Sequence, residues 1–167
     1  MSKKTMDNLT ASFAGESQAN RKYLAFAQKA EKEGNEKIAR LFRTIAEAET
    51  IHALKHLNTA GKVGTTIDNL KAAIEGETYE FDTIYPDFIA TAQAEGEKAA
   101  AKSFDLANEA EKVHAELYKK ALAALEAGGD MQAKSFHLCP VCGYVAVDHA
   151  PERCPICNAP ASSFKKY

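Results

Sequence analysis

The segment that decides the fold is Glu49-Thr-Ile-His52, which recurs 62 residues later as Glu111-Lys-Val-His114. The same shift superimposes other residues of the chain, namely Phe26 on Phe88, Glu33-Gly34 on Glu95-Gly96, Phe42 on Phe104, and Glu47-Ala48 on Glu109-Ala110. A repeat of this length indicates two related helical hairpins. A pseudo-two-fold arrangement of the hairpins would bring their equivalent faces together at the centre of a bundle.

The flanking sequence predicts four helices between about Thr5 and Ala127. It is rich in Ala, Glu, Lys and Leu, with apolar residues at helical spacing and few β-branched runs. The helices are separated by turn residues at Gly34-Asn35, Gly61 to Thr66, Gly96 and Gly128-Gly129. Thr66 is the expected N-cap of the third helix. Pro86 predicts a kink or a short interruption within that helix, because proline lacks a backbone donor.

Each Glu-x-x-His pair lies on one helix face, because residues three apart are neighbours on a helix. The other two helices each add carboxylates on an apolar background, Glu16 on the first and Glu77 with Glu80 on the third. Taken singly, such residues are ordinary exposed charges. Together they favour a di-metal site, since several buried carboxylates without a cation would destabilise the bundle and oxygen ligands with a few imidazoles suit iron or manganese.

Two tyrosines are candidates for residues that hydrogen-bond the metal ligands without binding the metal themselves. Tyr23 lies two turns after Glu16, and Tyr85 lies five residues after Glu80. Either hydroxyl could donate a hydrogen bond to a ligand carboxylate. The alternative is an ordinary core tyrosine whose hydroxyl has another partner. No comparable sequence pattern indicates that His56, His137 or His149 is a metal ligand.

All four cysteines lie near the C-terminus, in two Cys-x-x-Cys pairs separated by eleven residues: Cys139, Cys142, Cys154 and Cys157. This spacing is a strong signal for one metal ion held by four thiolates, in a segment too short to bury a sufficient core. Iron and zinc both accept such a site. The sequence Cys139-Pro-Val-Cys142-Gly143-Tyr144 resembles a rubredoxin knuckle and favours iron. The second pair departs from that pattern with Asn158 in place of glycine, which still tolerates a left-handed backbone.

Composition excludes several functional classes. A formal net charge of −2 without a basic patch gives no basis for binding nucleic acid or an anionic membrane surface. No apolar run is long enough to span a membrane, and the N-terminus lacks the apolar region of a signal peptide. Together with the metal-type cysteine spacing, these features predict a cytoplasmic protein.

The glutamate and histidine pattern resembles that of ferritin-like di-iron and di-manganese proteins. With the cysteine pairs added, the chain resembles the rubrerythrin family over almost its full length, through segments in the family's order: Phe13-Ala-Gly-Glu16-Ser-Gln-Ala, Glu49-Thr-Ile-His52, Gly76-Glu77-Thr-Tyr-Glu80, Tyr85-Pro86 and Glu111-Lys-Val-His114. The resemblance implies an all-α, ferritin-like four-helix bundle over residues 1–128, a linker over 129–136 and a rubredoxin-like Fe(Cys)4 domain over 137–167.

The resemblance also implies ligand roles. Glu49 and Glu111 would bridge two irons, with Glu16 and Glu80 on one iron and Glu77 and His114 on the other. In the family, one iron exchanges a glutamate for a histidine on reduction, which here means Glu80 giving way to His52.

The implied activity is that of a non-haem peroxidase in oxidative-stress defence, which reduces hydrogen peroxide to water with electrons relayed through the cysteine-bound iron. No Gly-x-Gly-x-x-Gly motif is present, so a rubredoxin or a separate NAD(P)H-dependent reductase is the expected donor. A homodimer or higher homo-oligomer is expected. The alternatives are a ferroxidase or iron-storage protein, a metal or redox sensor with a zinc-ribbon module, and a di-iron oxygenase of an organic substrate.

Overall fold

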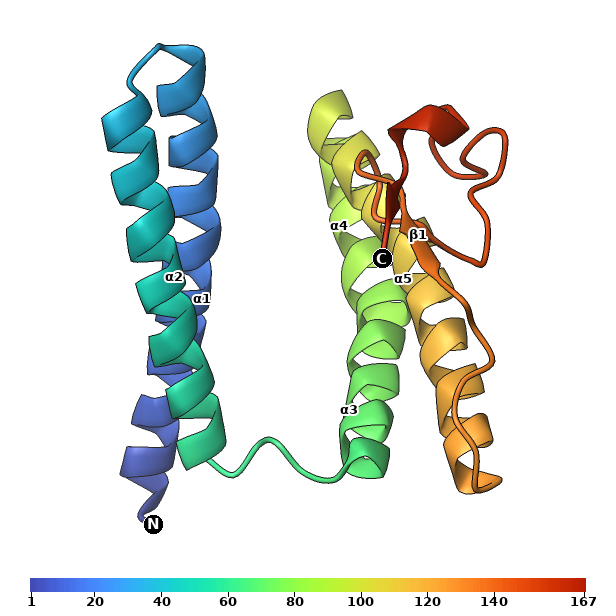
Figure 1. Ribbon diagram of the computed structural model, residues 1–167, viewed down its shortest axis with the longest axis horizontal. Coiled ribbons are helices and arrows are strands. Elements are labelled where there is room, and N and C mark those ends of the chain that lie inside the picture. Colours follow the sequence, from blue (N-terminus) through green and yellow to red (C-terminus); the bar gives the residue numbers. More distant parts are fainter. The chain divides into compact units, whose positions relative to one another are not determined.

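The computed structural model describes residues 1–167 as two compact units, Met1–Gly64 and Thr65–Tyr167 (Figure 1). The first unit is a hairpin of two helices. The second contains another helical hairpin and a small module with a three-stranded sheet. This mostly helical architecture confirms the predicted fold class of a helical bundle protein with a C-terminal cysteine module. No helix has the length and apolar character needed to cross a membrane.

The first unit consists of α1 (Lys3–Lys32) and α2 (Glu36–Thr59). The Ser2 hydroxyl caps α1 by accepting a hydrogen bond from the backbone N–H of Thr5 at 3.2 Å. The turn between the helices contains Gly34 at φ 78°, a left-handed conformation suited to glycine. Small residues line the seam between the helices, and the buried ones are alanines at Ala27, Ala30, Ala39, Ala46 and Ala53. The two backbones therefore approach closely but enclose no large side chain.

The helical part of the second unit consists of α3 (Thr66–Tyr79), a π-helical segment η1 (Glu80–Ile84), α4 (Tyr85–Ala94) and α5 (Lys98–Glu126). The N-cap of α3 is Thr65, one residue before the predicted Thr66. Thr65 and Asp68 form a reciprocal capping box, which places the start of the helix one residue earlier than expected. The expected interruption near Pro86 is η1, and the proline lies in the first turn of α4.

The cysteine module follows α5 after a stretch without regular structure. It contains β1 (Phe136–Leu138), β2 (Val145–Val147), the short 3-10 helix η2 (Ala161–Ser163) and β3 (Lys165–Lys166). The strands form an antiparallel sheet in the order β2-β1-β3. The module packs against α5, where Leu106 contacts the cysteine cluster. A Cβ added to Gly143 would lie 3.8 Å from the Cβ of Ala110, so the module's backbone lies directly on the helix.

Candidate metal centres

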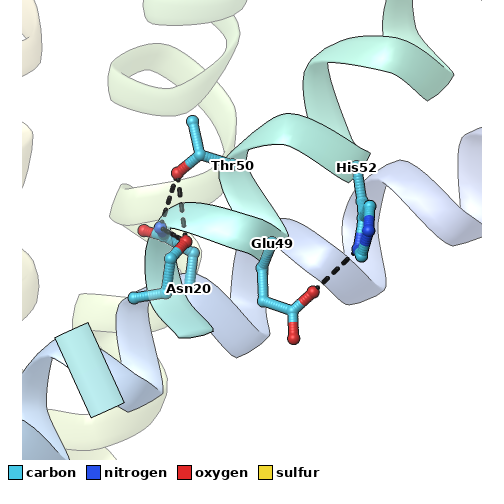
Figure 2. A network of polar contacts seen from close by, with 5 residues as sticks. Asn20, Glu49, Thr50 and His52 are labelled. Atoms are coloured by element: carbon cyan, nitrogen blue, oxygen red, sulfur yellow. Dashed lines mark hydrogen bonds and ion pairs between the residues drawn. The ribbon is translucent and has the colours of Figure 1, made fainter. Parts of the chain in front are cut away.

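The first unit brings together Glu16 from α1 with Glu49 and His52 from α2. One potential ligand atom from each residue lies within 4.8 Å of the others. The Nδ1 atom of His52 is 3.0 Å from Oε2 of Glu49, and 55% of the histidine side chain is exposed (Figure 2). The cluster therefore offers three ligand atoms to one cation.

A buried asparagine fixes α1 against α2 beside this cluster. The side-chain amide of Asn20 donates hydrogen bonds to the carbonyl oxygen of Ala46 at 2.7 Å and to the Thr50 hydroxyl at 2.8 Å (Figure 2). Because a buried amide needs such partners, these bonds define the register of the two helices. Glu49 and Thr50 are adjacent, so the same contact positions the first Glu-x-x-His motif.

The second unit repeats the arrangement with Glu77 from α3 and with Glu111 and His114 from α5, again within 4.8 Å. The Nε2 atom of His114 donates a hydrogen bond to the Gly143 carbonyl oxygen at 2.9 Å. On the other side of the ring, Nδ1 lies 2.6 Å from Oε2 of Glu111. Since Nε2 carries a proton, a contact this short is a hydrogen bond donated by a protonated Nδ1 to the carboxylate. The Nδ1 side of the ring is therefore the side that faces the carboxylates of the cluster.

The charges of the second cluster also indicate a cation site. Burial raises the pKa of Glu77 to about 7, reinforced by the neighbouring Glu111 carboxylate and opposed by His114. Burial acts to lower the pKa of His114, but the Gly143 carbonyl, Glu111 and Glu77 outweigh it and raise that pKa. Without a metal ion, Glu77 therefore keeps its proton to a higher pH than an exposed glutamate. A divalent cation would replace that proton, so the donor set of carboxylate oxygens and imidazole nitrogen fits iron.

Glu80 and Tyr85 lie beside the second cluster without joining it. Burial raises the pKa of Glu80, and the nearby Glu77 raises it further. Burial also raises the pKa of Tyr85, with additional contributions from Glu80 and Glu111. The Tyr23 ring packs against Phe26 and Phe42. Neither tyrosine hydroxyl makes a hydrogen bond to a ligand carboxylate in this structure, so that role remains a prediction.

The π-helical segment is a one-residue insertion in the second repeat. Before it, equivalent residues are 61 positions apart, as in Gly15-Glu16 and Gly76-Glu77; after it they are 62 apart, as in Tyr23 and Tyr85. A π-bulge accommodates one extra residue and is frequent at functional sites. Glu80 begins this segment, and the residue 61 positions earlier is Ala19. In the sequence, the insertion is visible as a change in the spacing of equivalent residues from 61 to 62 positions. A single shift of 62 applied to the whole chain does not reveal it.

The four cysteines form the third cluster, and none is in a disulfide. The Sγ atoms of Cys139 and Cys157 are 3.5 Å apart, as are those of Cys142 and Cys154. Sulfur ligands at about 2.3 Å from a tetrahedral ion would be separated by roughly 3.7 Å, so the cluster fits one iron. Burial acts to raise the pKa of Cys139, but backbone N–H groups of Val141 and Cys142 outweigh it and lower that pKa to about 7.

The two cysteine pairs form matching backbone turns. The N–H groups of Gly143 and Asn158 donate hydrogen bonds to the Cys139 and Cys154 carbonyl oxygens at 3.0 and 2.9 Å. Gly143 has φ 84° and Asn158 has φ 64°. Asparagine tolerates this left-handed conformation better than most residues, which confirms that the second knuckle forms without glycine.

The contact between His114 and Gly143 was not foreseen from the sequence. Gly143 directly follows the ligand candidate Cys142, so its carbonyl connects a cysteine-cluster turn to a histidine of the helical cluster. His137 is engaged elsewhere, with Nε2 3.1 Å from the Ser135 hydroxyl and 3.1 Å from the Asp148 carbonyl oxygen. It therefore has no ligand role in these clusters.

Comparisons with known proteins agree with these centres. The Rubrerythrin family model matches residues 7–122, and the model for the rubredoxin-like domain of rubrerythrin matches residues 137–165. Rubrerythrin-2 of Clostridium acetobutylicum is 38% identical, with 98% of this chain and 96% of the relative covered. Nigerythrin of Nitratidesulfovibrio vulgaris is 41% identical, with 98% and 86% covered.

Solved structures give the same result. The fully reduced, all-ferrous state of nigerythrin is 39% identical to this chain, with a TM-score of 0.59 and coverage of 98% of this chain and 86% of that one. The family implies a di-iron site supplied by the glutamate and histidine groups, and one further iron at the four cysteines. On both the sequence matches and the clustered ligands, the chain belongs to the rubrerythrin family.

Proposed function

We propose that this protein is a peroxidase that reduces hydrogen peroxide to water at a di-iron site and is re-reduced through its cysteine-bound iron. The hydrogen bond from His114 to the Gly143 carbonyl carries this proposal. It joins a ligand of the helical site to the residue that follows Cys142. A storage protein or a zinc-ribbon sensor would have no need for a contact between these two sites.

The proposed di-iron site combines the two helical clusters with Glu80. Glu49 and Glu111 would bridge the two ions, which offsets the repulsion between them. Glu16 and Glu80 would complete one ion, and Glu77 with His114 the other. On reduction, His52 would replace Glu80. The ring of His52 makes a polar contact with Glu49 at 3.0 Å, and turning toward the iron would give up this single hydrogen bond.

Reduction of one hydrogen peroxide to two waters consumes two electrons and two protons. When bound, the iron pair supplies the two electrons that the O–O bond accepts as it breaks. The chain's own contribution is to hold protons near the site. Burial raises the pKa of Glu80, so this carboxyl group, when it is not bound to metal, keeps its proton to a higher pH than an exposed glutamate. Glu80, once it is released as a ligand, is the group that we assign to proton delivery.

Electrons would return one at a time from the cysteine site. The path runs from the Cys142 sulfur through one peptide link to the Gly143 carbonyl, and across the hydrogen bond to the His114 ring. The protein has no dinucleotide-binding fingerprint. We therefore assign the supply of electrons to a rubredoxin or a separate NAD(P)H-dependent reductase, in the reducing cytoplasm where the four thiolates persist.

The test separates the peroxide reaction from the electron supply. Cys142→Ser should abolish steady-state peroxide turnover with an external donor. The same variant, reduced anaerobically beforehand, should still consume roughly one equivalent of peroxide per di-iron site, because its helical ligands are intact. Val141→Ala, an exposed neighbour in the same turn, is the matched control and should retain both activities.

Peroxide consumption, absorption of the ferric thiolate and total metal content would be followed together. Undiminished steady-state turnover in Cys142→Ser would contradict the relay. Helical iron that stays reduced when peroxide is added to the wild type would contradict the peroxidase reaction itself and favour storage. Zinc at the four cysteines would favour the sensor.

A further inference from the structure

Three residues of α5 contact the cysteine module from one face of the helix. Leu106 packs against the buried cysteines. Ala110 lies against Gly143, and His114 donates its hydrogen bond to the carbonyl oxygen of that glycine. Because these three residues of α5 are spaced four apart, each lies one turn beyond the last. The alanine allows the close approach and the histidine links the two metal sites, whereas the leucine contacts the cysteine site alone.

The leucine is not part of the internal repeat. The alanine and the histidine of this face recur on α2 at the shift of 62 residues, but the residue 62 positions before Leu106 is Thr44. The Thr44 hydroxyl donates a hydrogen bond to the Arg40 carbonyl oxygen of its own helix at 3.0 Å. An apolar side chain at this position is therefore found on the helix that carries the cysteine module, and a polar one on its counterpart.

The cysteine cluster is enclosed mainly by its own module. Cys139, Cys142 and Cys154 are buried. The partly buried side chains that pack against them are aliphatic or aromatic, and the module supplies Tyr144, Ile156, Ala159 and Phe164. Leu106 is the member of this shell that comes from the helical part of the unit. It covers the sulfurs from the side of α5 and excludes water there.

The net charge of a four-thiolate iron site depends on the oxidation state of the metal. The site has one net negative charge with ferric iron and two with ferrous iron, since it takes up one electron and no proton. Loss of hydration disfavours the more highly charged state, so an apolar cover lowers the reduction potential. Backbone N–H groups directed at the sulfurs have the opposite effect. The module supplies these, from Val141, Cys142, Tyr144 and Ala159.

We propose that Leu106 lowers the reduction potential of the cysteine-bound iron by keeping water away from the sulfur ligands on the side of α5. It is a positioning residue, because it acts through the sulfurs and binds neither iron nor substrate. A lower potential makes the ferrous site a stronger one-electron reductant toward the helical iron, which then gains the electron that the cysteine site loses. This consequence rests on the proposed function, whereas the effect on the potential does not.

The first experiment replaces Leu106 with threonine, the residue at the equivalent position of α2. The side chain is smaller and polar, so it leaves room for water beside the sulfurs. The full-length, iron-loaded protein would be titrated anaerobically, with the ferric thiolate followed by its visible absorption. At the ambient potential that half reduces the wild type, Leu106→Thr should have a ferrous-to-ferric ratio higher by roughly threefold or more. An unchanged or lower potential would overturn the proposal.

Two controls separate loss of the apolar cover from other disturbances of the module. Leu106→Met keeps an apolar side chain of similar volume and should keep the wild-type potential. Val141→Thr introduces threonine at a side chain that is already 59% exposed, and it preserves the backbone N–H. It should also keep the wild-type potential. A rise in Leu106→Met as large as that in Leu106→Thr would contradict a role for water exclusion.

The second experiment detects the admitted water itself. In water enriched in oxygen-17, electron–nuclear double resonance of the ferric site should show a stronger oxygen-17 coupling in Leu106→Thr than in the wild type. The threonine hydroxyl oxygen does not exchange with solvent, so it does not contribute to this signal. A raised potential without a stronger coupling would mean that the leucine acts by another route, and the proposal would fall.

Iron content at the cysteines and thermal unfolding check that each variant folds. If Leu106→Thr does not hold its iron, Leu106→Ala takes its place, with the same expected rise in potential and in oxygen-17 coupling. Both measurements are independent of peroxide turnover. A wild-type potential in the threonine variant would overturn this inference and leave the peroxidase proposal standing. A wild type that is inert to peroxide would overturn the peroxidase proposal and leave the effect of Leu106 on the potential unchanged.

Discussion

In the α1–α2 hairpin, His52 makes a polar contact with Glu49, whose Oε2 lies 3.0 Å from its Nδ1. In the hairpin formed by α3, α4 and α5, the equivalent His114 is held between Glu111 and the Gly143 carbonyl. The two Glu-x-x-His motifs are equivalent in sequence, but only the second has a neighbouring module to fix its histidine. The same motif therefore holds its histidine differently in the two hairpins, and the difference comes from a module outside the repeat.

The third helical stretch differs from the first by the residue inserted at η1. The first hairpin has Ala19 where the second has Glu80, so the symmetric pattern of three ligands per hairpin gains a further acid on one side only. With the proposed ligand assignment, this insertion would make the two metal positions unequal. Such inequality suits a site in which one ion changes a ligand during turnover while the other keeps its own.

The largest effect is expected from removing a proposed bridge. Glu111→Ala should empty the di-iron site and lower peroxide turnover by at least about 100-fold, because both ions lose a ligand. Metal analysis and steady-state peroxide consumption measure the two effects. Glu109→Ala, two residues away and paired with Lys112, is the control and should behave as wild type. Full di-iron occupancy in Glu111→Ala would remove the residue from the ligand set.

Replacement of each histidine tests the comparison directly. His114→Ala should lose roughly 100-fold in turnover and also lose iron, because a ligand and its link to Gly143 disappear together. His52→Ala should retain most of its iron and lose roughly 10-fold in turnover, since in the proposed exchange this residue binds iron in only one redox state. Iron content and turnover with an external donor would be measured for both. Equal losses of iron would show that the two histidines are equivalent.

A smaller effect is expected from the inserted acid. Glu80→Ala gives the second hairpin the residue found at position 19 of the first, so three ligands per hairpin remain. Iron binding should largely persist, while peroxide turnover falls roughly 10-fold through loss of the exchangeable ligand and proton donor. Glu75→Ala, an exposed acid one turn earlier on α3, should leave turnover unchanged. A Glu80→Ala protein with wild-type turnover would argue against ligand exchange.

Much of the fold and of the candidate ligand set was predictable from the sequence, because both depend on spacing. Glu49 with His52, Glu111 with His114 and the paired cysteines are local patterns that a helix or a tight turn converts directly into clusters. The His114–Gly143 contact was not predictable, because it joins two elements 29 residues apart through a backbone carbonyl that has no sequence signature. The π-helix was predicted only as an unspecified interruption near Pro86, since one inserted residue barely alters the repeat.

The smallest predicted effect concerns the metal-free protein, in which Glu77 has no cation beside it. Its pKa is raised to about 7 from an ordinary value of 4.5, so the folded state holds a proton that the unfolded chain releases. As pH rises from about 4.5 to 7, the folded state therefore loses stability relative to the unfolded chain. The raised pKa of His114 acts in the same direction above its ordinary value of 6.5. The lowered pKa values of the exposed Glu31 and Glu116 matter only below about 4.5.

Glu77→Gln should reduce the change of the unfolding free energy with pH, because the amide cannot release a proton in the folded or the unfolded state. Denaturant unfolding of the chelated wild type and Glu77→Gln at pH 5 and 7 measures the difference, with Glu75→Gln as the control from the same helix. The wild type should lose more stability than Glu77→Gln between these two pH values. Parallel curves would mean that Glu77 titrates as an exposed carboxylate, and that the second hairpin holds its ligands no more tightly than the first.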